Sequence, residues 1–429
     1  RKRSLLGALE QRSLSTANEV SRLHDLLCFL RAWPDGPALR TQADRMLEGF
    51  SSRRDLRKHR GRLAGSGIAG TEMRFRFFGA TASWLAGRWG DFLWIDWPAF
   101  ENAEKLEEFL THLSHYAETP GLDEYEFSAR EWIARMKGPG ETDAAFLIRR
   151  FGALRADPAL RGKIYDDLDP PLRLLPGPDT PSRTREKFPA RRIAYQIGPL
   201  AGRPADLRRE IESARPRFQE LSGRRARRLM DLARGTMAAR QRDLDAFAYA
   251  DPRDVRLADC GGGIQIALFG MIPERRFLLE TIYGFLVLKN GVPVGYGAGL
   301  GLFSSFDTAI NIFPAFRGGE TALLYRCVLA VFRRFYRADT ISMDPFQLGW
   351  DNEEALASGA WWFYRLLGFA PRDPSALRLA REEERRRRKN PAYRTSPGRL
   401  LRLAEAPLFL SLKKEREDVL GLLDLGVVG

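Results

Sequence analysis

The sequence predicts a mixed α+β fold: a central mixed β-sheet flanked by helices in the C-terminal half, preceded by a helical or α+β N-terminal domain. Between Val255 and Phe313, apolar stretches of strand length follow one another closely, and helical and strand-like segments alternate after them. Residues 1–60 instead show leucines at helical spacing. A chain of 429 residues exceeds one ordinary hydrophobic core, so we expect at least two domains.

Changes in composition suggest where these domains begin and end. Residues 170–189 are rich in Pro, Gly, Asp, Ser and Thr, which makes them the best linker candidate. From Ala205 to Phe247 the chain is mostly helical and strongly basic, with four arginines between 224 and 228. The predicted parts are an N-terminal α+β domain without an assigned role (1–189), a basic helical connector (190–250), the sheet domain (251–375) and a charged helical tail (376–429).

The N-terminal half shows a change of period. Leucines 23, 26, 27 and 30 share one helical face, and this helix stops at Trp33–Gly36. Apolar and basic residues then alternate along Met73–Phe77, which is typical of a half-buried strand. A second short strand is expected at Phe92–Trp97 and a helix at about 99–118.

The clearest local motif is a β-hairpin centred on Asn290-Gly291. These two residues accept the positive φ angles of a type I′ turn, and apolar strands flank them on both sides. Both faces of Tyr283–Leu288 are apolar, so this strand should be central and covered on both sides. We expect the next strand at Thr308–Phe313.

A glycine turn follows that strand and leads into a long amphipathic helix. The turn runs from Arg317 to Ala322, and the helix covers about 319–337. Unpaired backbone N–H groups and the helix dipole attract anions at such a helix start, and a pyrophosphate would suit it. An ordinary strand–turn–helix connection is the alternative.

A second motif closes the predicted sheet domain. After a strand at 339–343, a helix is expected over about 353–367, with Asp351 and Glu354 arranged as a helix-start cap. Gly368 is well placed to end this helix. Tyr364 near its end either points into a cleft, where its hydroxyl could protonate a leaving thiolate, or packs in the core.

These ordered motifs resemble the GNAT acyltransferase superfamily over about residues 251–375. In that family an Arg/Gln-x-x-Gly-x-Gly/Ala turn holds the coenzyme A pyrophosphate, and Arg317 and Ala322 match its first and last positions. The later Tyr-x-x-x-Gly-Phe motif matches fully, from Tyr364 to Phe369. Glu320 replaces the middle glycine, and a carboxylate there would repel a pyrophosphate.

The resemblance implies specific roles for residues. Tyr364 would be catalytic, protonating the departing thiolate. The strand before the turn would flank the pantetheine arm of the cofactor through its backbone. The implied cofactor-binding residues are Asn311, Ile312, Phe313, Arg317, Gly318, Gly319, Glu320, Thr321 and Ala322.

The resemblance names no general base. Glu280, Asp344 and Glu353 are candidates by position alone, and each would more commonly be a surface or capping residue. Asp243 and Asp245 lie just before the first strand of the sheet domain, where they could face an acceptor or cap a helix.

The expected function is therefore transfer of an acyl group from acetyl-CoA or another acyl-CoA to an unidentified amine. One alternative is an aminoacyl-tRNA-dependent transferase of the same fold. Another is a non-catalytic binding or scaffold protein that has lost the cofactor, as Glu320 suggests.

Composition limits the remaining possibilities. The net charge of +14 fits either a solvated arginine-rich surface or a polyanionic partner such as tRNA. Cys28, Cys260 and Cys327 have no paired spacing, which favours a reducing cytoplasm over a disulfide framework or zinc site. No apolar run is long enough to span a membrane, and no apolar stretch follows the basic residues 1–3, so we expect no signal peptide.

Two weaker patterns have structural explanations. Gly65–Gly70 spells a dinucleotide-binding pattern, but a basic helical stretch precedes it and a strand follows, the reverse of the order required. It should be a loop. His112 and His115, near Glu108, lack an obvious fourth ligand, so we expect no metal site.

Overall fold

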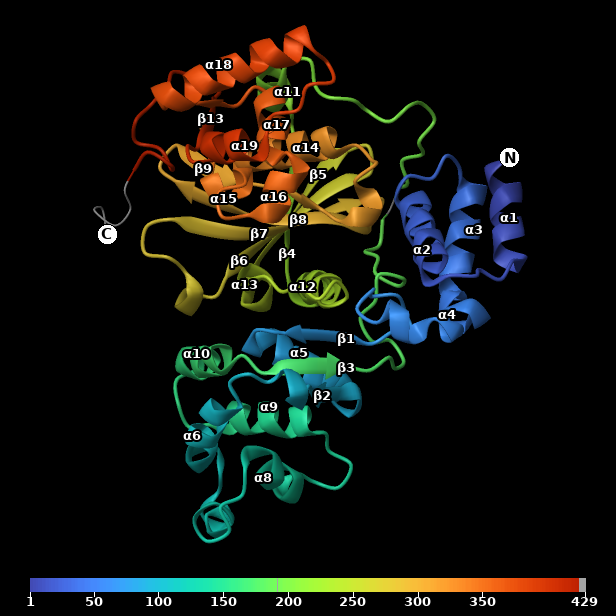
Figure 1. Ribbon diagram of the computed structural model, residues 1–429, viewed down its shortest axis with the longest axis vertical. Coiled ribbons are helices and arrows are strands. Elements are labelled where there is room, and N and C mark those ends of the chain that lie inside the picture. Colours follow the sequence, from blue (N-terminus) through green and yellow to red (C-terminus); the bar gives the residue numbers. More distant parts are fainter. Residues whose placement is uncertain (191, 424–429) are drawn as a thin grey trace.

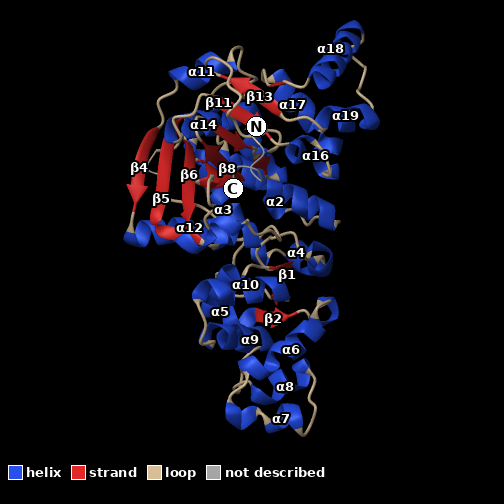
Figure 2. Cartoon of the chain, turned by 90° about the vertical axis from the view of Figure 1, so that its left-hand side faces the viewer, coloured by secondary structure: helices blue, strands red, loops and turns tan. Residues whose placement is uncertain are grey.

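The computed structural model describes residues 1–190 and 192–423 as a mixed α+β protein with three parts (Figure 1). N-terminal helices lie beside a large mixed sheet, and a smaller unit built on a three-stranded sheet lies below both (Figures 1 and 2). None of the described helices is long and apolar enough to cross a membrane.

The N-terminal helices belong to the core of the large sheet. Thr16 and Glu19 form a reciprocal capping box that starts the second helix. Leu23, Leu27 and Leu30 of this helix are buried with residues of the large sheet, whereas Leu26 is exposed. Trp33 ends it, as predicted. The helices are α1 (Lys2–Gln11), α2 (Ala17–Ala32), α3 (Pro37–Glu48) and α4 (Arg54–Lys58).

The small-sheet unit has a core of its own. Its three strands are antiparallel, and β3 lies between β1 and β2. The elements are β1 (Met73–Arg76), α5 (Gly79–Trp89), β2 (Leu93–Ile95), α6 (Ala103–Leu113), α7 (Pro120–Asp123), α8 (Ala129–Met136), α9 (Asp143–Ala153), α10 (Pro158–Leu168) and β3 (Pro171–Leu174).

The predicted linker at 170–189 is therefore wrong in its first residues. Leu172 and Leu174 are both buried and alternate with half-buried Arg173, which is the pattern of a strand. The surrounding prolines concealed that pattern, because a central strand rarely contains proline. Only the residues after β3 form a connection without regular structure.

The large sheet has the strand order β12-β13-β11-β9-β8-β7-β6-β5-β4, and β10 also pairs with β8. Every pair is antiparallel except β9 and β11, which run parallel. The strands are β4 (Arg217–Leu221), β5 (Ala250–Gly261), β6 (Ile264–Met271), β7 (Thr281–Lys289), β8 (Val292–Leu302), β9 (Ser305–Thr308), β10 (Asn311–Ile312), β11 (Thr340–Met343), β12 (Ala370–Pro371) and β13 (Leu408–Ser411).

Helices cover both faces of this sheet. In Figure 1, α14 lies on one face while α12 and α13 lie on the other. The helices are α11 (Leu207–Ser213), α12 (Gly223–Ala238), α13 (Asp245–Ala248), α14 (Thr321–Phe335), α15 (Pro345–Leu348), α16 (Glu353–Ser358), α17 (Ala360–Leu366), α18 (Pro374–Lys389) and α19 (Pro397–Ala404).

The sheet extends beyond the predicted limits of 251–375 on both sides. Strand β4 falls in the predicted helical connector, and β13 falls in the predicted helical tail. Four of the five residues of β4 are exposed at the sheet edge, so it lacks the apolar alternation of an inner strand. The four residues of β13 are all buried and too few to show a period of their own.

Of the two local motifs, the hairpin was predicted correctly and the helix at 353–367 was not. Asn290 and Gly291 have φ angles of 52° and 80°, and they join β7 to β8 as the predicted hairpin. The predicted helix at 353–367 is instead two helices, interrupted at Gly359 where φ is 69°. Asn352, not Asp351, caps the first of them by accepting the amide of Ala355.

A stripe of glycines lets α14 lie close to the sheet. In β8, Gly299 faces the ring of Phe332 in α14, and Gly301 faces the ring of Tyr336, which directly follows this helix. A Cβ atom added at Gly299 would lie 2.5 Å from the Phe332 ring, closer than real side chains approach. The C-terminal end of the helix therefore packs closely against the strand.

Candidate functional site

The two parallel strands part at the centre of the large sheet. Strand β9 pairs with β11 as far as Asp307 and Ser342. Beyond this point the chain follows β8, and Ala309 and Ile310 interrupt the ladder before pairing resumes in β10. The predicted single strand at Thr308–Phe313 is thus split in two, and its edge facing β11 is no longer paired with that strand.

Two tyrosines lie at this divergence. The Tyr325 hydroxyl of α14 donates to the carbonyl of Thr308 at 2.9 Å. The Tyr364 ring packs 5.5 Å from the Tyr325 ring and is only 4% exposed. Burial and the nearby charge of Asp307 raise the pKa of Tyr364, which keeps its proton, and the amide of Ile310 contacts its hydroxyl. Tyr364 is thus part of an aromatic core, and its hydroxyl also reaches the interrupted strand.

Asp307 is a functional candidate that the sequence reasoning missed. Its carboxylate accepts from the Ser342 hydroxyl at 3.3 Å, at the last paired position of β9 and β11. Burial, together with the charge of Asp344, raises the pKa of Asp307 to about 7. A carboxylic acid next to Phe306 and directly before the predicted strand was the available signal, but that strand was taken to begin one residue later, at Thr308.

The three bases suggested by position lie elsewhere. Asp344 is exposed and caps α15 by accepting the amide of Phe346 at 2.8 Å. Glu353 is exposed in the first turn of α16, and Glu280 precedes β7 in a loop. Asp344 therefore has the capping role that the sequence left open, although its charge acts on Asp307.

The glycine turn leaves the start of α14 uncapped by side chains. The helix begins at Thr321, and Glu320 makes no capping hydrogen bond to it. Among the described residues, no group accepts a hydrogen bond from the amides of Thr321, Ala322 or Leu323. Gly318 is exposed, whereas Gly319 lies against the indole of Trp33. These amides are the donors that the sequence predicted at this place.

Glu320 points away from the helix start into the protein. It is 5% exposed and accepts from the Trp33 indole at 2.9 Å and the Ala201 amide at 3.0 Å. The Lys289 ammonium lies 3.4 Å away. Burial alone would raise the pKa of Glu320, but these three donors hold it below its ordinary value. The carboxylate is ionised, and Lys289 neutralises its charge.

Four of the nine predicted cofactor residues line a cavity of about 190 Å³: Asn311, Ile312, Phe313 and Arg317. The other five, Gly318 to Ala322, lie outside its lining. Three further arginines that the sequence reasoning did not select complete the cavity, namely Arg183, Arg240 and Arg242. Among the described residues, no carboxylate lines it.

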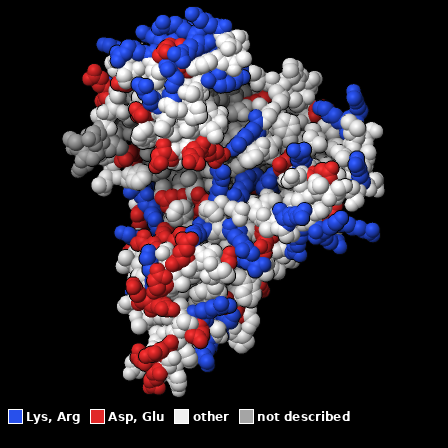
Figure 3. All heavy atoms as spheres, in the orientation of Figure 1, with Lys and Arg blue, Asp and Glu red and all other residues white. Residues whose placement is uncertain are grey.

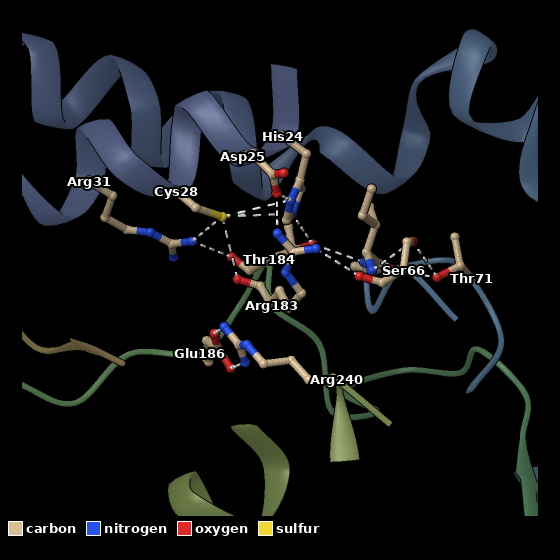
Figure 4. A network of polar contacts seen from close by, with 12 residues as sticks. His24, Asp25, Cys28, Arg31, Ser66, Thr71, Arg183, Thr184, Glu186 and Arg240 are labelled. Carbon is tan, nitrogen blue, oxygen red and sulfur yellow. Dashed lines mark hydrogen bonds and ion pairs between the residues drawn. The ribbon is translucent and has the colours of Figure 1, made fainter. Parts of the chain in front are cut away.

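Acidic residues behind the cavity hold two of these arginines in place (Figure 4). Arg183 pairs with Asp25 of α2 and donates to the Ser66 carbonyl at 3.0 Å. Arg240 forms a two-pronged pair with Glu186, in which both side chains are at most 8% exposed. Both guanidinium groups are therefore preorganised.

The same network reaches a buried cysteine and histidine on α2. Cys28 and His24 lie next to each other with 3.7 Å between Sγ and Nδ1, and His24 contacts the Thr184 hydroxyl at 2.9 Å (Figure 4). Burial opposes ionisation of the thiol, but His24 and two arginines lower the pKa of Cys28 to about 7. Both side chains are buried, and the Cys28 thiol contacts the carbonyl of Arg183, whose side chain lines the cavity.

The glycine pattern at Gly65–Gly70 forms a loop before β1, as predicted. Its three glycines all have positive φ, and a Cβ at Gly67 would collide with the Ala239 carbonyl. Gly65 and Ser66 line the arginine cavity. The glycines therefore allow close packing of the loop against the end of α12.

A larger cavity of about 880 Å³ lies by the edge strand β4. The basic side chains that line it include Arg225 and Arg228 from the predicted arginine cluster, together with Arg192 and Arg217. Figure 3 shows further basic side chains in the hollow where the large-sheet unit meets the N-terminal helices, while acidic ones gather over the small-sheet unit.

The described residues contain no group of three or more His, Cys, Asp or Glu side chains that could hold a metal ion. Comparisons with protein-family models, with curated proteins and with solved structures found no match for this chain.

Proposed function

We propose that the large-sheet unit is an acyl-CoA-dependent N-acyltransferase whose donor binds at the start of α14. The observation that carries this proposal is the set of unpaired amides at Thr321–Leu323, beside two parallel strands that part. A helix start of this kind attracts a diphosphate, and Arg317 adds a positive charge next to it. Glu320 points inward and pairs with Lys289, so its carboxylate would not repel a pyrophosphate at the helix start. That repulsion was the argument for a protein that has lost the cofactor.

The chemistry needs a base and an acid close to the parting strands. The amine nitrogen attacks the thioester carbonyl, and Asp307 accepts the proton that the nitrogen loses. The carbon–sulfur bond then breaks, and the Tyr364 hydroxyl donates its proton to the departing thiolate. The products are an amide and free coenzyme A. A base with a pKa of about 7 is matched to this task near neutral pH.

Calorimetric titration with acetyl-CoA tests donor binding directly. We expect saturable binding that Arg317→Gln weakens, because this change removes the charge beside the turn. Arg333→Gln, at the opposite end of α14, is the matched control and should bind as the wild type does. Absence of binding at millimolar acetyl-CoA would overturn the proposal.

Tyr364→Phe tests the assigned acid. The ring still fits the aromatic cluster, so the fold and donor affinity should persist while turnover falls by roughly 10²–10⁴-fold. Steady-state kinetics with calorimetry separates the two effects. Unchanged turnover would show that Tyr364 is a core residue and not the acid.

A second candidate is a transferase that uses aminoacyl-tRNA as its donor. The large arginine-lined cavity by β4 favours it, because a polyanion could lie along that edge. Steep weakening of RNA binding with added salt, without any acetyl-CoA binding, would select this candidate over the first. A cytoplasmic location suits either donor.

A further inference from the structure

The arginine cavity opens on the face of the sheet opposite α14. Gly299 and Gly301 of β8 face α14, so the intervening residues face the other side. Gly284, which pairs with Ala298, confirms this orientation, because a Cβ there would meet Phe247 of α13. Tyr296 lies two residues before Ala298 and shares that face. The ring of Tyr296 is therefore on the side away from the proposed donor site.

Aromatic rings form a flat wall of the cavity. The rings of Tyr296 and Phe313 stack with their centroids 5.5 Å apart and their planes 21° apart. The Arg240 guanidinium lies 3.8 Å above the Phe313 ring, and Arg242 donates to the Tyr296 hydroxyl at 2.8 Å. The Phe313 ring holds Arg240 and the Tyr296 hydroxyl holds Arg242, so these two side chains would lose little conformational entropy when a ligand binds.

The charges in the cavity are unbalanced. Four guanidinium groups line it, while the three carboxylates that pair with them, Asp25, Glu186 and Glu354, lie outside the lining. Arg242 reaches Glu354 only at 4.0 Å. Arginine presents several N–H donors in a planar fork that matches carboxylate or phosphate oxygens. Four guanidinium groups against three carboxylates leave one positive charge uncompensated, which an anion in the cavity would balance.

We infer that the cavity binds an anionic group, carboxylate or phosphate, carried by the amine that accepts the acyl group. This inference rests on the proposed function: the Tyr296 wall of the cavity lies on the face of β8 opposite α14, and Arg317, in the turn before α14, also lines the cavity, so the two sites adjoin at this residue. An acceptor anchored there would approach the interrupted segment at Ala309 and Ile310 from the side away from the donor. Acceptors without a negative charge would lose this anchor.

The experiment uses two probes on the full chain, inorganic phosphate and succinate, with binding measured by calorimetry and by the shift in melting temperature. Arg242→Gln is the test variant, because its half-exposed side chain can be replaced with little risk to folding. Arg224→Gln, an exposed change on α12 outside both cavities, is the control. Acetyl-CoA binding is measured separately on all three proteins.

We expect one probe or both to bind the wild type and the control equally, with affinity about tenfold lower in Arg242→Gln and acetyl-CoA binding unchanged. Preference for phosphate or for succinate identifies the anionic group. If neither probe binds the wild type at tens of millimolar, or if Arg242→Gln binds both as well as the control does, the inference fails while the proposed function stands. If Arg242→Gln instead loses acetyl-CoA binding, the cavity belongs to the donor and the inference fails.

Discussion

At the scale of single residues, Asp307 is a carboxyl group whose protonation changes near neutral pH. It is held at the last paired position of two parallel strands, and Asp344 lies close enough for its charge to disfavour ionisation of Asp307. The raised pKa means that Asp307 is protonated below about 7 and ionised above it. A base must be ionised to act, so activity should fall as the pH drops through this value.

Two substitutions separate this role from the general effect of charge. Asp307→Asn should lower kcat by roughly 10²–10⁴-fold and remove the acidic limb of the pH profile. Asp344→Asn removes only the neighbouring charge, so the limb should remain and move to lower pH. Profiles of kcat/KM for the three proteins check both effects, and an unchanged limb in Asp307→Asn would contradict the assignment.

Glu320 is a buried charge that stabilises the fold only through the groups it pairs with. Glu320→Gln keeps an acceptor for Trp33 but leaves Lys289 charged and buried without its counter-ion. The free energy of unfolding should fall by roughly 3–5 kcal/mol in denaturant titrations at pH 7. The lowered pKa of Glu320 means that its stabilisation is present above its ordinary value of 4.5 and is lost as the pH falls further.

The difference in stability between wild type and Glu320→Gln should therefore shrink below about pH 4.5. An apolar pair, Glu320→Leu with Lys289→Met, should recover much of the loss, because no charge is then left unpaired. Equal stability of Glu320→Gln and wild type at pH 7 would show that the pair contributes nothing.

How far residues could be predicted depended on how local their contacts are. The Asn290-Gly291 turn follows from the φ angles of two neighbouring residues and was predicted. The Arg317–Ala322 turn was placed correctly at the start of a helix. The partners of Glu320 are Trp33 at the end of α2, Ala201 in the connection before α11 and Lys289 at the end of β7, and no local pattern connects them.

At the scale of elements, β8 and α14 form one closely packed unit. Glycines at alternating positions remove the side chains that would separate strand from helix, and rings of α14 fill the space. This contact holds the C-terminal end of α14 against the sheet. A glycine-rich strand that precedes an aromatic helix was a usable signal in the sequence.

Gly299→Val tests this contact. The added side chain would collide with the Phe332 ring, so we expect a loss of roughly 1–3 kcal/mol in unfolding free energy. Gly152→Ala is the control: a Cβ there meets open space near the end of α9, and stability should stay equal or rise slightly. Shortening the ring with Phe332→Leu should relieve part of the loss in Gly299→Val. Wild-type stability of Gly299→Val would contradict close seating.

Elements were predictable where their period was long enough to read. The hairpin strands and α14 each span several turns or alternations, and their positions were predicted within a few residues. Strands β3 and β13 have four residues each, and prolines or a helical leucine spacing nearby hid them. The arginine cavity was only partly found, because its lining comes from five separate segments of the chain.

At the scale of the whole molecule, Asp166 ties the small-sheet unit to the large sheet. Its carboxylate accepts from the Gly79 amide at 2.8 Å within its own unit. Across the boundary it accepts from the Tyr249 hydroxyl at 2.8 Å and from Arg275 at 2.7 Å. One side chain therefore orients both units at their contact.

Asp166→Ala should uncouple the two units. Loss of these partners should cost roughly 1–3 kcal/mol and separate the unfolding of the small-sheet unit from that of the large sheet in differential scanning calorimetry. Asp167→Ala, an exposed neighbour, is the control and should unfold as the wild type does. A single unshifted transition in Asp166→Ala would show that other contacts dominate the boundary.

The placement of β13 between β11 and β12 has a consequence for how the chain is made. Synthesis proceeds from the N-terminus, so β11 and β12 leave the ribosome before their shared neighbour exists. Until residue 411 has emerged, β11 presents an open edge that other chains could join. A nascent or prematurely terminated chain that lacks these four residues should therefore be the species most dependent on chaperones.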